Sequence, residues 1–306
     1  MRSDEKLMST LVGILLYLLS LLPRKLSQRL GILVGIINLK LDSRSSRVTS
    51  ANLELCLPGL TDKFAGTEEA SRQSLIETGK TLMETPAVWL GDVDRLDEWI
   101  QVVHNESLLQ EYLNDPAGLL VLLPHMGNWE LFNVFYRRYG QMTALYHPPR
   151  QPYMQKVMRK VRGRYGNHMV PTTRSGLKQL YQTLNSGETA VILPDQVPAT
   201  GQFAPFFGHP ALTDVLASRL LRKTGAKALG IAMVRNDEGL FEVHVLAPDP
   251  SIYETNEITS IRAVNDLMQT CAEIAPAQYQ WEYKRFRERP TGSAKIYRFN
   301  KPNGVH

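Results

Sequence analysis

A histidine and a glutamate stand five positions apart in the segment LLVLLPHMGNWE, residues 119–130, where an apolar strand gives way to a turn. Gly127 belongs to that turn, and Asn128 is a favourable N-cap for the helix predicted after it. His125 then lies on the loop, and Glu130 lies in the first helical turn, from which its carboxylate can reach back. A carboxylate that accepts the Nδ1 hydrogen fixes the tautomer, leaves Nε2 as a base and stabilises the imidazolium.

The same spacing also has a purely structural interpretation, a satisfied loop histidine beside a helix start, because so short a pattern often arises by chance. If the segment is instead a functional site, the first N–H groups of the predicted helix are suited to bind an oxyanion. The chain has no Gly-x-Ser-x-Gly elbow, and neither Cys56 nor Cys271 is near the histidine in sequence. We therefore predict that the histidine activates a substrate hydroxyl, in direct acyl transfer without a covalent enzyme intermediate.

A second apolar segment ends in the same way. The sequence AVILPDQ places Asp195 directly after a strand and a proline. Ligands of open α/β sheets bind beyond the carboxyl ends of the strands. The two strands are therefore expected to deliver His125 and Asp195 to one cleft, although Asp195 is equally compatible with a structural turn carboxylate.

Short apolar strands alternate with helices, which predicts an α/β fold with a mixed, largely parallel sheet flanked by helices. The expected strands cover 119–123, 142–147, 168–171, 189–194, 228–235 and 240–247. The expected helices cover 67–90, 105–114, 129–139, 151–165, 174–186, 212–224 and 257–274. The last two strands should form an antiparallel hairpin. Residues 42–51 are predicted to be a polar connector, and 203–211 a loop rich in Phe and Pro.

The N-terminal segment 7–23 is uncharged and flanked by basic residues. Its length is at the short limit for crossing a hydrocarbon core of about 30 Å. Its basic exit lacks the small residues of a signal-peptide cleavage site. A second apolar segment, 30–41, follows. We expect a membrane anchor over 1–41 that spans or only dips into the membrane, and a catalytic domain over 42–306; a buried core helix is the alternative.

The 306-residue chain is 43% hydrophobic, as in globular proteins, and its formal net charge of +5 favours an anionic partner. Residues 150–167 hold six basic side chains and no acid, which suits a phosphate- or carrier-protein-binding surface or simply a solvated helix. Aromatic side chains are not interleaved with these charges, so nucleic acid is not expected. Two distant cysteines, scattered histidines and the lack of a nucleotide-binding fingerprint predict neither a metal nor a cofactor.

The sequence resembles the late acyltransferases of lipid A biosynthesis, membrane-bound enzymes that add secondary acyl chains to the lipopolysaccharide anchor. The resemblance is carried, in family order, by HMGNWE (125–130), LPDQ (193–196), FAPFFGHPA (203–211), RKTGA (222–226) and PAQYQWEYKRFRERP (276–290). The His-x-x-x-x-Glu box is shared with many glycerolipid acyltransferases of the lysophospholipid acyltransferase-like superfamily. The last segment is far more specific.

This resemblance implies one α/β acyltransferase domain on the cytoplasmic face of the inner membrane. Phospholipids of that membrane are then expected partners. It implies an acyl–acyl carrier protein as donor and a lipid A precursor as acceptor. His125 is then the general base and Glu130 its partner. The candidates for substrate, oxyanion or phosphate contacts are Arg150, Arg159, Arg164, Asn128 and Asp195.

One departure leaves the choice of arginine and of acceptor open, because the family often has Tyr-Arg-Pro where this chain has Tyr146-His147-Pro148. Three rival functions also stay open. The first is acyl transfer to another lipid, such as a lysophospholipid or an amino-acid lipid. The second is a non-catalytic protein that binds anionic lipid at a membrane, and the third is a thioesterase.

Overall fold

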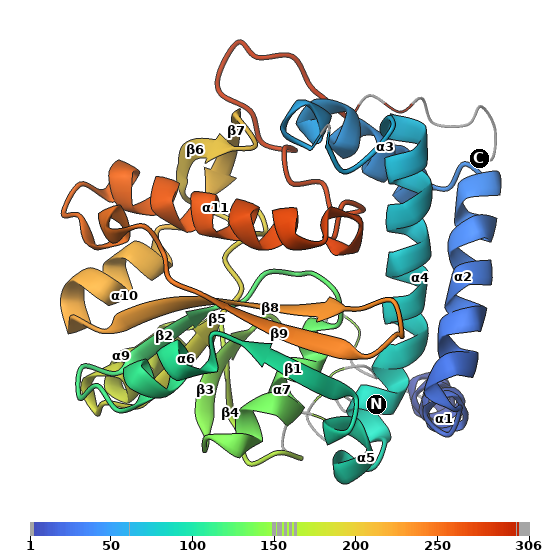
Figure 1. Cartoon of the computed structure of the whole chain (residues 1–306), viewed down its shortest axis with the longest axis horizontal. Coiled ribbons are helices and arrows are strands. Elements are labelled where there is room, and N and C mark those ends of the chain that lie inside the picture. Colours follow the sequence, from blue (N-terminus) through green and yellow to red (C-terminus); the bar gives the residue numbers. More distant parts are fainter. Residues whose placement is uncertain are drawn as a thin grey trace.

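The computed structural model describes residues 3–60, 62–148, 151, 155, 158, 161, 164–297 and 299. Within them, seven strands form one sheet in the order β1-β9-β8-β2-β5-β3-β4, and β6 and β7 form a separate hairpin (Figure 1). The strands are β1 (Ile100–His104), β2 (Leu119–Leu122), β3 (Met142–Tyr146), β4 (His168–Pro171), β5 (Thr189–Ile192), β6 (Gln202–Phe206), β7 (His209–Thr213), β8 (Lys227–Arg235) and β9 (Phe241–Leu246).

Helices precede, connect and cover these strands. The α-helices are α1 (Ser3–Ser20), α2 (Arg24–Lys40), α3 (Arg44–Cys56), α4 (Thr67–Leu90), α5 (Val93–Asp97), α6 (Glu106–Leu113), α7 (Phe132–Phe135), α9 (Arg174–Asn185), α10 (Leu216–Thr224) and α11 (Glu257–Ile274). Short 3-10 turns are η1 (Leu57–Gly59), η2 (Trp129–Leu131), η3 (Tyr136–Arg138), η4 (Pro250–Tyr253) and η5 (Pro276–Gln278).

The sheet is mixed and largely parallel, as predicted. Strands β8, β2, β5, β3 and β4 run parallel to one another, β9 turns back antiparallel to β8, and β1 pairs in parallel with β9. The carboxyl ends of β2 and β5, which are adjacent and parallel, therefore meet at one edge of the sheet. That edge is where the sequence places His125 and Asp195.

The sheet is the middle of three layers. Alternate residues of β2 enter two hydrophobic cores: Leu120 and Leu122 pack with α9, α10 and α11, whereas Leu119 and Val121 pack with α6 and α7. All four residues are buried. A strand covered on both faces has a continuous apolar sequence, which explains why LLVL carries no alternation of polar residues.

Helix α2 packs along α4 at the side of the sheet (Figure 1), and glycines allow the close approach. A Cβ atom on Gly31 would lie 2.4 Å from the Lys80 Cα, and one on Gly35 would lie 2.4 Å from the Leu75 carbonyl oxygen. Gly79 is the corresponding glycine of α4, and a Cβ atom on it would lie 2.2 Å from the Gly31 carbonyl oxygen. The second apolar segment is thus packed closely against α4.

Several predicted elements were wrong, and each has a physical reason. Residues 42–51 are not a connector: most of them lie in α3, whose buried face includes Val48 and Leu53. The loop predicted at 203–211 is the hairpin of β6 and β7, closed by Phe207 and Gly208 at positive φ. As a result α10 begins only at Leu216. The helix predicted over 67–90, by contrast, is confirmed as α4, and Pro86 lies inside it.

The N-terminal helices and the residues that directly follow them expose an apolar surface. Their exposed hydrophobic side chains are Met8, Leu11, Ile14, Leu15, Tyr17, Leu18, Leu21, Leu26, Leu33, Ile37 and Leu41. No single helix of the described residues is long and apolar enough to cross a bilayer. Met8–Ser20 and Arg24–Lys40 meet those criteria only as a pair, bent by 118° at the break.

Candidate active site

The structure brings His125 and Asp195 together at the sheet edge. Leu122 and Ile192 are paired across β2 and β5, and each polar residue follows its strand by three positions (125 − 122 and 195 − 192). His125 Nδ1 lies 2.7 Å from Asp195 Oδ1, and the His125 backbone N–H donates to Asp195 Oδ2 at 2.8 Å. The carboxylate therefore fixes both the backbone and the ring of the histidine.

Asp195 is held as an anion in the protein interior. Its side chain is 1% exposed, whereas that of His125 is 16% exposed and reaches the surface. Burial alone would raise the pKa of Asp195, but the charge of His125 and the two hydrogen bonds from it lower that pKa overall. The positive charge of Arg285 acts in the same direction. Asp195 is thus an ionised carboxylate directed at the Nδ1 side of the imidazole.

The expected contact between Glu130 and His125 Nδ1 was wrong, because Asp195 occupies that nitrogen. The predicted helix over 129–139 is also broken into η2, α7 and η3, so it offers no long helix behind its first N–H groups. Glu130 lies in η2, near Tyr165, whose pKa is raised mainly by burial and also by the negative charge of Glu130. The carboxylate from the distant strand, not the neighbouring one, holds the histidine.

Asn128 stands at the predicted N-cap position, but its side chain makes no capping hydrogen bond. It is fully buried, and its Nδ2 donates to Glu84 Oε2 of α4 at 3.3 Å. Its Oδ1 has no hydrogen-bond partner among the residues that the structure describes. Asn128 thus links the histidine loop to α4.

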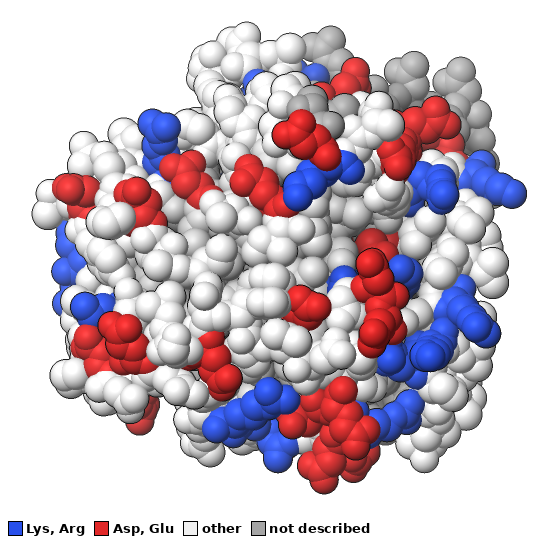
Figure 2. All heavy atoms as spheres, in the orientation of Figure 1, with Lys and Arg blue, Asp and Glu red and all other residues white. Residues whose placement is uncertain are grey.

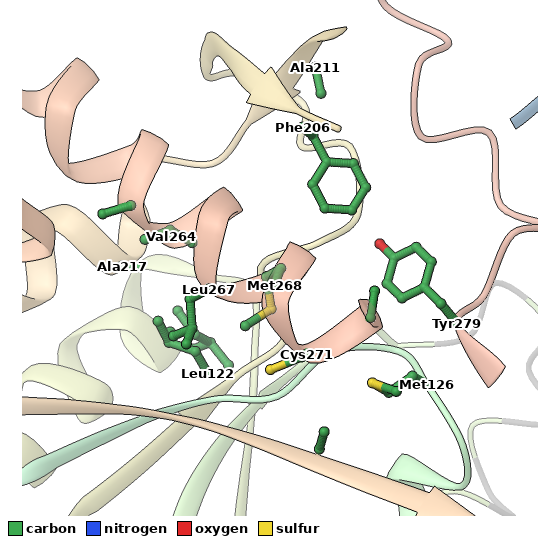
Figure 3. Packing of buried hydrophobic residues seen from close by; sticks show 14 of the residues in the cluster. Leu122, Met126, Phe206, Ala211, Ala217, Val264, Leu267, Met268, Cys271 and Tyr279 are labelled. Carbon is green, nitrogen blue, oxygen red and sulfur yellow. The ribbon is translucent and has the colours of Figure 1, made fainter. Parts of the chain in front are cut away.

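The segment after α11 holds the histidine loop by backbone pairing. Met126 and Tyr279 form an antiparallel bridge, flanked by two hydrogen bonds. The Gly127 N–H donates to the Gln278 carbonyl at 2.9 Å, and the Gln280 N–H donates to the His125 carbonyl at 3.0 Å. In Figure 3, Tyr279 lies between Phe206 and Met126 in the buried cluster. The position of His125 therefore depends on the C-terminal segment as well as on β2.

Gly127→Ala is expected to reduce turnover by roughly 100-fold, the cost of misplacing a catalytic group by about 1 Å. Gly127 has a φ of 53°, and an added Cβ would lie 1.7 Å from the Met233 carbonyl oxygen. The loop must move to relieve that overlap. Steady-state kinetics beside Gly66→Ala, at a position with open space around it, tests this; equal activities would contradict it.

A buried ionic cluster between α4 and β8 supports the same loop. Arg235 at the end of β8 pairs with Glu84 and Glu77 of α4, and Arg235 and Glu84 are both buried. The side chain of Gln278 is hydrogen-bonded to the backbone N–H and carbonyl of Arg235. Glu84 also accepts from Gln28 of α2 at 2.7 Å. Helix α2, α4, β8 and the C-terminal segment are thus joined beside the site.

The three candidate arginines are not equally placed. Arg150 and Arg159 lie outside the described residues. Arg164 is described, and its guanidinium donates to the Trp89 and Gly91 carbonyls at the C-terminal end of α4, at 3.0 and 2.6 Å. Cations stabilise the end of a helix in this way. The contacts of Arg164 therefore account for a structural role.

Three residues of the C-terminal segment surround the pair and were not predicted individually. Tyr279 is buried, and burial together with the charge of Asp195 raises its pKa well above the usual value. Arg285 is buried and donates to the Leu212 carbonyl at 2.6 Å. Burial raises the pKa of Glu282, which accepts from Thr78 at 3.1 Å and lies within the field of His125. Only the family motif at 276–290 marked this segment in the sequence.

Neither cysteine is suited to act as a nucleophile. Cys56 and Cys271 are both free and buried. Burial raises the pKa of both thiols, and the charge of Asp195 raises that of Cys271 further. A thiolate is the nucleophilic form, so both groups are unreactive at neutral pH.

Two cavities differ in their relation to the pair. One of about 630 Å³ lies at the amino ends of β3 and β5, with Met142 and Thr189 in its wall, at the opposite edge from His125. The other, about 580 Å³, lies among α2, α4 and the turn between β8 and β9. Gln278, which binds the histidine loop, lines this second cavity. This second cavity is the α2 cleft.

Comparison with known proteins identifies the family. The profile described as bacterial lipid A biosynthesis acyltransferase matches residues 3–288. The chain is 27% identical over 300 residues to the lipid A biosynthesis lauroyltransferase of Escherichia coli (strain K12), covering 94% of each chain. It is 26% identical over 271 residues to the palmitoleoyltransferase of that strain, covering 88% of this chain and 87% of the relative. The chain therefore belongs to the bacterial lipid A biosynthesis acyltransferases, the family whose late-acting members its motifs resemble.

Proposed function

We propose that this protein transfers a fatty acyl chain from acyl–acyl carrier protein to a hydroxyl group of a lipid A precursor, with His125 as general base. The observation that carries this proposal is the pairing of His125 Nδ1 with the buried, ionised carboxylate of Asp195. Such a pairing keeps the proton on Nδ1, so that Nε2 accepts the proton of the attacking hydroxyl.

In the proposed reaction, Nε2 of His125 removes the proton as the hydroxyl oxygen attacks the thioester carbonyl carbon. The carbonyl electrons move onto oxygen, and Asp195 stabilises the imidazolium that has formed. The tetrahedral intermediate then re-forms the carbonyl, the carbon–sulfur bond breaks, and the departing thiolate takes the proton from His125. The products are an ester and the free thiol of the carrier protein. Arg150 and Arg159 remain candidates for contacts with the oxyanion or with phosphate.

The cysteines support direct transfer because their thiols are buried and their pKa values are raised. A ping-pong mechanism needs a nucleophile on the protein, activated by a base or a lowered pKa. We therefore propose one complex that holds donor and acceptor together, without an acyl-enzyme.

The α2 cleft favours an anionic lipid as the acceptor. Its walls carry the cations Arg24, Lys25, Arg29 and Lys80 beside the acids Glu77, Asp237 and Glu238, and Gln278 connects them to the histidine loop. Figure 2 shows Lys and Arg side chains gathered along the side of the molecule formed by α2. Such side chains bind phosphate by charge-assisted hydrogen bonds.

We further propose attachment to the cytoplasmic face of the inner membrane through α1 and α2. The bent pair exposes leucine, isoleucine and tyrosine side chains, with Arg24 and Lys25 at the bend. An apolar face bordered by basic residues is typical of a helix that lies in the interfacial plane of an anionic membrane. Phospholipid is therefore a proposed partner.

The experiment uses the full chain purified in detergent, acyl–acyl carrier proteins of several chain lengths and an under-acylated lipid A precursor. Mass spectrometry of the lipid should show one added acyl chain with the parent protein and none with His125→Asn. Glu130→Gln in parallel tests whether that carboxylate is also required. Asp249→Asn, which removes a negative charge at the N-cap of η4 and keeps the Oδ1 acceptor, is the matched control and should retain activity.

Each rival function predicts a different result. A product only with lysophospholipid or amino-acid lipid identifies another acceptor. Free fatty acid released without acceptor indicates a thioesterase. Salt-sensitive binding to anionic liposomes, with no product from any donor and acceptor, indicates a lipid-binding protein and contradicts the proposed transfer.

A further inference from the structure

Two histidines and a glutamate come together on the outer strands of the sheet, apart from His125 and Asp195. His104 Nε2 lies 2.8 Å from Glu242 Oε2, and His244 Nε2 lies 3.8 Å from that same oxygen. The two imidazole rings stack with centroids 4.3 Å apart. One ligand atom from each residue lies within 4.8 Å of the others.

Strand pairing fixes this cluster. His104 ends β1, and the parallel pairing of β1 with β9 sets it directly beside His244. Glu242 is two residues before His244, so the two side chains leave the same face of β9. The intervening Val243 is fully buried on the other face. Three donors are therefore held on a rigid surface of two strands.

The glutamate has a supporting partner of its own. Asn236 Nδ2 donates to Glu242 Oε1 at 3.3 Å and to Gln101 Oε1 of β1 at 2.8 Å. This leaves Oε2 as the oxygen that faces both histidines. Hydrogen bonds that orient a ligating carboxylate are a regular part of protein metal sites. Asn236 thus serves as the outer support of the cluster.

We propose that His104, Glu242 and His244 bind a divalent d-block ion such as Zn²⁺, which fastens the edge strand β1 to β9. Bonds of about 2.0–2.2 Å in tetrahedral geometry place two ligand atoms roughly 3.4 Å apart. The two histidine–glutamate separations of 2.8 and 3.8 Å lie on either side of that value, and all three ligand atoms lie within 4.8 Å of one another. Two imidazoles and one carboxylate favour Zn²⁺ over Mg²⁺ or Ca²⁺, which prefer oxygen ligands.

Partial exposure makes the cluster accessible to an ion from solvent. The exposed fractions of the side chains are 43% for His104, 27% for Glu242 and 20% for His244. Three protein ligands leave a fourth position for water. Because β1 is the edge strand of the sheet, the ion connects a strand that otherwise has one neighbour. Its role is to stabilise that edge, and this inference does not depend on the proposed acyl transfer.

The test is a zinc titration of the full chain, first freed of metal by a chelator, in competition with a chromophoric chelator. We expect one zinc ion per chain, a raised Tm, and slower amide hydrogen exchange in β1. Glu242→Gln should weaken binding by more than about 10-fold, since even loss of outer-shell partners costs about 10–100-fold. His168→Gln, on the exposed surface of β4 at the other edge, is the matched control and should bind normally.

Cobalt gives a second readout that does not depend on stability. Co²⁺ bound by two imidazoles, a carboxylate and water should produce visible absorption bands, and the double variant His104→Gln/His244→Gln should abolish them. Circular dichroism of each variant verifies folding. Zinc binding that survives both Glu242→Gln and the double variant, or the lack of saturable binding by the parent protein, would overturn the proposal.

Discussion

Asp195→Asn is expected to lower kcat by about 10⁴-fold, the loss seen when an amide replaces the carboxylate of a histidine–aspartate pair. The amide cannot both accept the Nδ1 hydrogen and stabilise the imidazolium, so the ring is held in the wrong tautomer. KM for donor and acceptor should change little, because Asp195 is 1% exposed and supports the histidine from its buried side. The measurement is steady-state acyl transfer with parent and variant side by side.

Two other carboxylate variants are measured beside Asp195→Asn. Glu130→Gln shows whether the carboxylate close in sequence contributes independently of the one on Nδ1. Asp214→Asn removes a carboxylate outside the pair, whose Oδ1 accepts from the Leu216 N–H at 2.8 Å, and should leave turnover unchanged. If Asp195→Asn retains turnover within about 10-fold of the parent, the His125–Asp195 pair does not provide the general base for acyl transfer.

The pH dependence of stability follows from the lowered pKa of Asp195. A carboxyl group whose pKa is lower in the folded state stabilises the fold above the unfolded value of about 3.9. That contribution is lost as the pH falls through the lower folded-state value. Asp195 therefore stays ionised throughout the neutral range, and its own titration does not set a neutral-pH activity profile.

The sheet was largely predictable because its strands have strong local signals. The segments of β2, β5 and β8 are apolar runs bounded by Gly, Pro or charged residues, and the β8–β9 hairpin was predicted from a polar turn. Strand β1 was missed because IQVVH is short and half-exposed. The β6–β7 hairpin was missed because its two prolines and its turn, which includes Phe207 at positive φ, disguise the strand pattern.

The site was only half predictable. The strand-end argument brought His125 and Asp195 into one cleft, since that argument uses the topology of parallel sheets. The choice between Glu130 and Asp195 as the Nδ1 partner depends on side-chain direction in η2, which proximity in sequence does not determine. The long-range contacts of Tyr279 and Gln278 with the histidine loop had no local sequence signal, because a backbone bridge between distant segments leaves no periodicity in either segment.

Arg235→Met is expected to destabilise the protein by about 3–5 kcal/mol, the cost of removing one partner from a buried ion pair. Glu84 then stays buried without its cation, and Glu77 loses a second partner beside Lys80. Chemical denaturation with the full chain in detergent measures the change. Arg219→Met, which breaks an exposed pair with Glu257, is the matched control and should cost at most about 1 kcal/mol.

A second substitution distinguishes the stability lost through the broken ion pair from the stability lost through the change in side-chain volume. If the loss comes from an uncompensated charge, Glu84→Gln in the Arg235→Met background should recover part of it, giving a coupling energy of about 0.5–3 kcal/mol. Additive losses would instead assign the effect to packing. Because Glu84 also contacts Asn128 and Gln28, breaking the cluster should loosen the histidine loop and α2 together. Acyl transfer should therefore fall in Arg235→Met even at temperatures where the chain remains folded, which ties the support of the loop to the helices that carry the apolar surface.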